Sequence, residues 1–137
     1  MSSELFALGI KQFNEQQFYE CHDTFEAIWI EAIEIDKRFY QGILQIAVAC
    51  HHLSELNLRG AMILLGEGIR RLNDYQPDYQ NIDVTELLVD SGLLLETLQE
   101  LAVEHLAEFV ETLFHPKEDA TKNILNCQLP KISIVDS

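Results

Sequence analysis

The sequence predicts an all-α protein, a compact single-domain bundle of five or six helices. Apolar residues recur at the three- and four-residue spacing of amphipathic helices through most of the chain. No segment shows the pattern of a sheet strand clearly enough to be predicted as one. The length of 137 residues, with 47% apolar and 23% charged residues, suits one globular domain.

The first half of the chain predicts four helices, over about residues 3–13, 15–33, 37–56 and 58–72. Asn14, with Gln17 three residues later, is a capping signal for the second helix, and Asn57 is the predicted cap of the fourth. Gly66 and Gly68 predict a close helix crossing.

The second half begins with a loop over residues 76–81 and a helix start at Asp83 with Glu86. Helical spacing then continues to about Phe114, with a predicted break near Ser91–Gly92. We expect residues 1–116 to form the bundle domain and residues 117–137 to be a tail packed on it. Within this tail, residues 129–135 alternate slightly and are expected to lie extended.

The net charge of −14 argues against nucleic acid and anionic membranes as partners. Three cysteines, no basic and apolar leader and no long apolar run together predict a cytoplasmic protein with reduced thiols. From residue 72 to residue 116 there are ten acids and no Lys or Arg. Four of these acids form a predicted ladder: Glu96, Glu100, Glu104 and Glu108. Either this ladder is solvated, or a cationic neighbour such as Arg59, Arg70 or Arg71 relieves it.

The densest group of titratable residues is His22, Asp23 and Glu26. On a helix, His22 and Glu26 are neighbours four residues apart, and His22 falls within an apolar stripe. Such a pair needs polar partners, because an unsatisfied buried polar group costs about 1–3 kcal/mol. Four polar side chains share one face of the third predicted helix and are candidates, while His51 is expected to point elsewhere: Arg38, Gln41, Gln45 and His52.

Three interpretations of this group stay open. His22 and Glu26 are a structural pair joined to Gln45 or Arg38, or they ligate a metal together with His52, or His22 is a general base oriented by Glu26 with Arg38 binding an anionic substrate. We expect no bound metal and no cofactor, because only two imidazoles can meet here and catalytic zinc usually takes three protein ligands.

The motifs of the first half resemble those of a known family. The residues that carry the resemblance are Gly9, Phe13, Asn14, Tyr19, His22, Asp23, Glu26, Trp29, Arg38, Phe39, Gln41, Gly42, Ile43, Leu44, Gln45, Ala47, His52, Asn57, Gly60, Ala61, Leu64 and Leu65. Over about residues 5–75 they are similar to the family called domain of unknown function 309, found in bacteria, archaea and the plastid lineage. Asp23 stands where that family usually has Glu. The resemblance implies a small multi-helical domain and assigns no activity.

We therefore predict a non-catalytic helical binding or assembly module. The candidate binding residues are Trp29, Arg38, Gln41, Gln45 and His52. The alternative is a small enzyme or metal-binding protein centred on His22 and Glu26, the candidate catalytic residues, with Arg38, Gln45 and His52; whether the chain is an enzyme stays open. The expected partner is a protein or a small molecule, and a homo-oligomer is compatible with the sequence.

Overall fold

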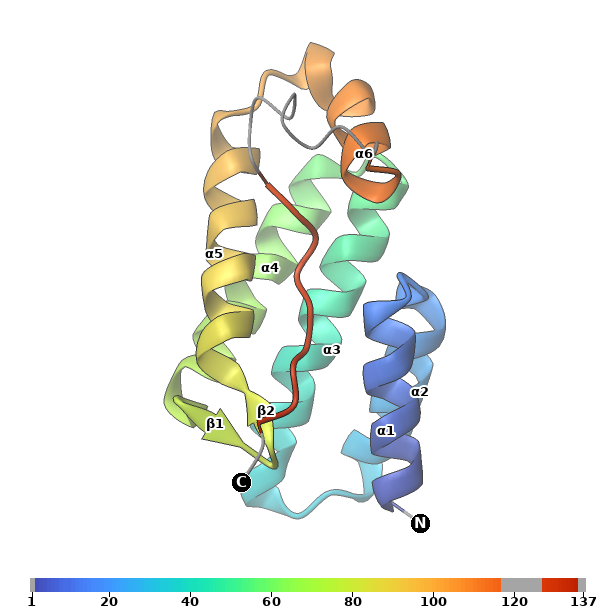
Figure 1. The fold of residues 1–137 in the computed structure, drawn as a ribbon, viewed down its shortest axis with the longest axis vertical. Coiled ribbons are helices and arrows are strands. Elements are labelled where there is room, and N and C mark those ends of the chain that lie inside the picture. The colour runs from blue at the N-terminus through green and yellow to red at the C-terminus, as the bar shows by residue number, and fades with distance from the viewer. Residues whose placement is uncertain (1, 117–126, 136–137) are drawn as a thin grey trace.

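Six α-helices and one short hairpin make up the part of the chain described by the computed structural model, residues 2–116 and 127–135 (Figure 1). The helices are α1 (Ser2–Asn14), α2 (Phe18–Glu31), α3 (Glu34–Ser54), α4 (Leu58–Leu72), α5 (Val84–Glu100) and α6 (Leu106–Phe114). Single 3-10 turns, η1 (Asn73–Tyr75) and η2 (Val103–His105), follow α4 and precede α6. The strands β1 (Asp78–Tyr79) and β2 (Ile82–Asp83) pair antiparallel between η1 and α5. The predicted all-α class is confirmed, and the two-residue strands are an addition that the sequence did not predict.

Two of the three predicted helix caps are present. The Asn57 side chain accepts a hydrogen bond from the backbone N–H of Gly60 (3.0 Å) at the start of α4. Asp83 does the same for the N–H of Glu86 (2.9 Å) at the start of α5. The prediction for Asn14 is wrong, because this residue ends α1, and α2 begins four residues later, at Phe18, after a turn with positive φ at Gln16.

The break predicted at Ser91–Gly92 is also wrong. α5 continues through both residues to Glu100, and the chain turns instead at the extended residues Leu101 and Ala102. Ser91 is fully buried on the same face of α5 as other core residues, so packing holds the helix together there. The later turn divides the predicted acidic ladder, since Glu104 lies in η2 and Glu108 in α6.

The hairpin is fastened to the first turns of α3 by aromatic residues. The Tyr79 hydroxyl donates to Asp36 (2.5 Å), and the Tyr40 hydroxyl donates to the side-chain oxygen of Gln80 (2.8 Å). The Tyr79 ring lies 4.9 Å from that of Phe39, which is fully buried. These contacts close one end of the bundle.

α3 is the central helix, and it crosses α4 at very short range. A Cβ atom added at Gly68 would lie 2.9 Å from the carbonyl oxygen of Gly42 and 2.7 Å from the Cγ1 atom of Ile46. Gly66, predicted to belong to the same crossing, has no such neighbour: the nearest atom to its added Cβ is in Leu95, at 4.0 Å. The prediction of a close crossing therefore holds for Gly68 and is wrong for Gly66.

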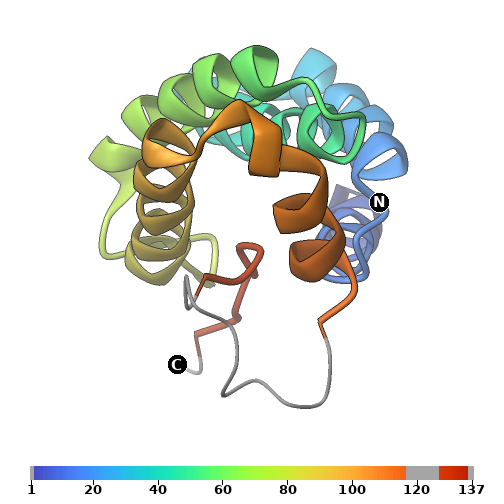
Figure 2. The ribbon, with the colours of Figure 1, turned by 90° about the horizontal axis from the view of Figure 1, so that it is seen from above.

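The helices follow one another around a curve, and the described part of the tail lies on its inner side (Figure 2). Residues 127–135 run past α3, between α5 and α1 (Figure 1). Leu129 and Ile132 are buried, and Ile134 forms an isolated bridge with Ile82 of the hairpin. The rest of the predicted tail, residues 117–126 and 136–137, lies outside the described residues. None of the described helices has the length and hydropathy of a membrane span.

Candidate functional site

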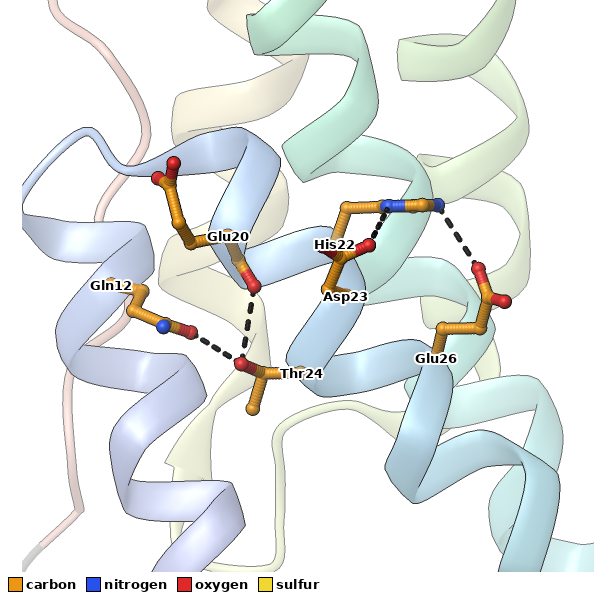
Figure 3. Close-up of polar contacts among 6 residues, drawn as sticks. All are labelled: Gln12, Glu20, His22, Asp23, Thr24 and Glu26. Atoms are coloured by element: carbon orange, nitrogen blue, oxygen red, sulfur yellow. Dashed lines mark hydrogen bonds and ion pairs between the residues drawn. The ribbon is translucent and has the colours of Figure 1, made fainter.

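His22 lies between two carboxylates on α2, as Figure 3 shows. Its Nδ1 atom is 3.2 Å from Oδ1 of Asp23, and its Nε2 atom is 3.2 Å from Oε2 of Glu26. The helix creates this geometry, because Glu26 is one turn further along and Asp23 is the next residue. The predicted contact between His22 and Glu26 is confirmed.

This cluster is at the surface. The side chains of His22, Asp23 and Glu26 are 30%, 65% and 50% exposed. Water therefore screens the interaction, and such pairs contribute about 0–1 kcal/mol to stability. A neutral imidazole has one N–H and donates to one carboxylate, whereas an imidazolium donates to both. The arrangement fixes the orientation of the ring more than it stabilises the fold.

A second polar group on α2 faces α1 (Figure 3). The buried Thr24 hydroxyl is 2.6 Å from the side-chain oxygen of Gln12 and 3.1 Å from the carbonyl oxygen of Glu20. The contact between Thr24 and Gln12 ties α2 to α1 and leaves the His22 cluster facing outward. α2 thus packs on α1 through Thr24, whereas Asp23 and Glu26 are exposed.

The residues predicted to join His22 from α3 lie elsewhere. Their described side-chain hydrogen bonds and ion pairs lead to α4 or its two ends. Arg38 approaches Asp74 (4.0 Å), and the Nδ1 atom of His52 is 3.3 Å from the side-chain nitrogen of Asn57. The prediction that Arg38, Gln45 or His52 joins His22 and Glu26 is therefore wrong, because the polar face of α3 is turned toward α4.

Gln45 belongs to a closed polar contact between α3 and α4. It is buried, and its amide nitrogen donates to Glu67 (3.2 Å) while its oxygen accepts from Arg71 (3.0 Å). Arg71 also pairs with Glu67 (3.8 Å), which completes a ring of three side chains. Both polar atoms of the Gln45 side chain thus have hydrogen-bond partners within the fold, as expected for a structural residue.

The two remaining candidate binding residues are only partly accessible. Trp29 is half-buried, with the Lys37 ammonium 4.7 Å from the centre of its ring. Gln41 is half-buried on α3. Neither is in a described contact with His22.

One aromatic side chain that was not among the candidate site residues, Tyr19, lies beside His22 and connects it to His51 of α3. The Tyr19 ring is 6.2 Å from that of His22 and 5.4 Å from that of His51. His51 was expected to point elsewhere, yet it is the α3 histidine that faces α2. Neighbouring positions on a helix differ by about 100°, so once His52 faces α4, His51 must face another element.

The described residues contain no group of three or more His, Cys, Asp or Glu side chains placed to hold a metal ion. The interpretation of His22, Glu26 and His52 as metal ligands thus gains no support from the geometry. The thiols are also poor nucleophiles. Burial raises the pKa of Cys21 to about 12, and it raises the pKa of the fully buried Cys50 as well.

The comparisons with known proteins define the class of the first half of the chain. The family model described as "Domain of unknown function (DUF309)" matches residues 6–64, so the resemblance is confirmed over this stretch. The chain is also similar to the "Uncharacterized protein YpuF" of Bacillus subtilis (strain 168), with 34% identity over 85 residues. That alignment covers 61% of this chain and 46% of the relative. No solved structure matches the chain.

Proposed function

We propose that the chain is a non-catalytic protein-binding module whose contact surface is the outer side of α2. This α2 outer surface consists of Tyr19, His22, Asp23, Glu26 and Ile30, and it continues to Ile33 in the turn before α3. Tyr19, Asp23, Glu26 and Ile30 fall within about 60° of one another on a helix. The surface lies entirely within the stretch that matches the family.

The observation that carries the proposal is the exposure of large apolar side chains on this surface. Tyr19 is 57% exposed, Ile30 60% and Ile33 66%. Single exposed apolar residues are common, but a row of them along one helix face is a feature of protein contact surfaces. Burying such side chains against a partner removes apolar area from water, which contributes about 25 cal/mol per Å².

The negative charges of this surface favour a partner surface with positive charges. Asp23 and Glu26 stand between the apolar side chains, and the whole chain has a net charge of −14. The best match is a protein surface with aliphatic side chains flanked by Lys or Arg. Nucleic acid and anionic lipid are disfavoured by the same charge. The contacts of His22 with both carboxylates hold the polar side chains in place before binding, which lowers the entropic cost of association.

Site-specific photo-crosslinking in cells that make the protein tests the proposal. A photoreactive amino acid replaces Ile30, and a control variant carries it at Val89, which is 63% exposed on α5. We expect a discrete protein adduct from position 30 and none from position 89. Mass spectrometry of the crosslinked peptide should identify a sequence that contains Lys or Arg.

A charge-reversed variant makes the test sharper. Asp23→Lys combined with Glu26→Lys should reduce the adduct at position 30 at least tenfold while the helical circular dichroism is unchanged. Equal adducts from positions 30 and 89, or an adduct that the charge reversal leaves intact, would refute the proposal.

The alternative, a small enzyme or metal-binding protein centred on His22 and Glu26, has less support. Of the five residues it requires, only His22 and Glu26 have described contacts with each other. The other three side chains, Arg38, Gln45 and His52, face α4.

A further inference from the structure

Residues 127–135 occupy the inner side of the curved helix layer as an extended segment (Figures 1 and 2). This inner groove is separate from the α2 outer surface. Its described walls are the end of α1 at Asn14, the hairpin from Asn81 to Asp83, and α5 at Glu86 and Asp90.

The groove binds the backbone of the segment. The Asn14 side chain donates to the carbonyl oxygen of Ile132 (2.9 Å) and accepts from the N–H of the same residue (2.8 Å). The N–H of Asp83 donates to the carbonyl oxygen of Ser133 (2.9 Å), and the N–H of Val135 donates to that of Asn81 (2.7 Å). Any amino acid other than proline offers the same groups, so these contacts accept many sequences.

The side chains of the segment occupy both buried and exposed positions. Leu129 and Ile132 are buried, with 6% and 3% of their surface exposed, whereas Ile134 is 57% exposed. Two polar contacts accompany them: Lys131 donates to the carbonyl oxygen of Asn14 (2.7 Å) and Ser133 donates to Glu86 (2.7 Å). The groove therefore holds the apolar side chains of Leu129 and Ile132, three residues apart, with the buried Pro130 between them.

We propose that this groove is a binding site for an extended polypeptide segment of a partner protein, with apolar residues three apart, and that residues 127–135 occupy it as an intramolecular ligand. Backbone recognition in a preformed groove is the way many modules bind extended peptides. The partner segment would displace residues 127–135 and make the same backbone hydrogen bonds and apolar contacts.

The helices have contacts of their own that do not involve this segment. α3 and α4 meet at the Gly42–Gly68 crossing, and the Phe25 and Phe39 rings are buried among α1, α2, α3 and the hairpin. We therefore expect the helical body to remain folded when the segment leaves. A segment attached to the same chain has an effective concentration in the millimolar range, so a free peptide competes poorly until the connection is cut.

The experiment uses the full chain with a recognition sequence for a site-specific protease between Pro116 and Cys127. After cleavage, a fluorescently labelled synthetic peptide of residues 127–137 is added, and its binding is followed by fluorescence anisotropy. We expect micromolar affinity for the cut chain and at least tenfold weaker binding to the uncut chain.

Two peptide variants form a matched pair. Ile132→Asp places a charge at a buried position and should weaken binding at least 30-fold, whereas Ile134→Asp, two residues on, should change it less than threefold. In the cut chain, Asn14→Ala should weaken binding of the unchanged peptide about tenfold through the loss of both backbone contacts.

Circular dichroism of the cut chain distinguishes a binding groove from a segment that serves only to stabilise the fold. The helical signal should stay within about a tenth of its initial value after the native segment has been removed by exchange and dilution. Loss of the helical signal, equal binding of the two peptide variants, or no exchange over days would overturn the proposal. Segment exchange between two uncut chains, seen as a dimer in gel filtration, would identify the occupant as a second copy and overturn the choice of a partner protein. None of these outcomes depends on the α2 outer surface.

Discussion

The close crossing of α3 and α4 makes Gly68→Ala the most informative test of the fold. The new Cβ would lie 2.9 Å from the Gly42 carbonyl oxygen and 2.7 Å from Cγ1 of Ile46. The Ile46 side chain could rotate, but the Gly42 carbonyl belongs to the backbone of α3 and cannot. The helices must therefore separate, and such overpacking costs about 1–3 kcal/mol.

Alanine also stabilises a helix relative to glycine, by about 0.8–1 kcal/mol in a helix interior. This gain partly offsets the clash at Gly68. Because one of the close atoms is backbone, we take the upper part of the overpacking range and expect the free energy of unfolding to fall by about 1–2 kcal/mol.

Gly66→Ala is the matched control on the same helix. The nearest atom to its added Cβ is Cδ2 of Leu95 at 4.0 Å, an ordinary van der Waals contact. Because no clash opposes it, only the higher helix propensity of alanine affects stability here. This variant should therefore be about 0.8–1 kcal/mol more stable than the unchanged chain. Urea unfolding followed by far-UV circular dichroism measures both variants. A Gly68→Ala protein as stable as the Gly66→Ala protein would show that α3 and α4 do not approach closely at Gly68.

Four further predictions follow from the charges and thiols. Glu26→Gln removes one charge beside the exposed His22 ring and should lower the free energy of unfolding by less than about 1 kcal/mol; a loss above about 2 kcal/mol in urea would contradict the surface location. Burial raises the pKa of Cys21 to about 12 and also raises that of Cys50, whereas an unfolded thiol has a pKa near 8.5. The stability that this difference contributes is complete below about pH 8.5 and falls as the pH rises toward 12, so urea midpoints should decrease from pH 8 to pH 10, and a constant midpoint would argue against buried thiols. Sodium chloride should raise the thermal midpoint, because ten acids without a Lys or Arg lie within residues 72–116 and salt screens their repulsion; a steady fall up to about 0.5 M would show that attractive pairs dominate. Elemental analysis should find far less than one zinc or iron per chain, and about one per chain, lost in His22→Ala, would restore the metal-site hypothesis.

The features that could be predicted from sequence are those made by near neighbours along the chain. Asn57 and Asp83 cap helices through backbone groups three residues away, and His22 meets Glu26 one helical turn away. Each contact requires only the geometry of one turn, which a sequence pattern contains.

The features that could not be predicted depend on distant parts of the chain. Asn14 is a residue type that often caps helices, but its side chain binds the backbone of Ile132, 118 residues away. Ser91 and Gly92 are residue types that often interrupt helices. Ser91 is nevertheless fully buried, and α5 continues through both residues. In both cases tertiary contacts outweigh a local preference of about 1 kcal/mol.

The candidate site was predicted only in part, because the neighbour of each helix face also depends on distant parts of the chain. A helical wheel places Arg38, Gln45 and His52 on one face of α3, and the structure has them on one side, but the wheel does not say which neighbour that face meets. It meets α4, where Gln45 is held by Glu67 and Arg71. The missing information is the rotation of α3 about its axis, which packing on both neighbouring helices determines.

The two proposed surfaces differ in how much of the chain they require. Residues 6–64, which match the family, contain most of α1, all of α2 and α3, and the start of α4. A protein with only this stretch in common can carry an outer α2 surface, whereas the inner groove also needs the hairpin and α5. The proposed binding through α2 could therefore be shared by proteins that have only this stretch in common with the chain. Recognition of an extended segment should occur only in those proteins whose second half also supplies the hairpin and an α5 that close the groove.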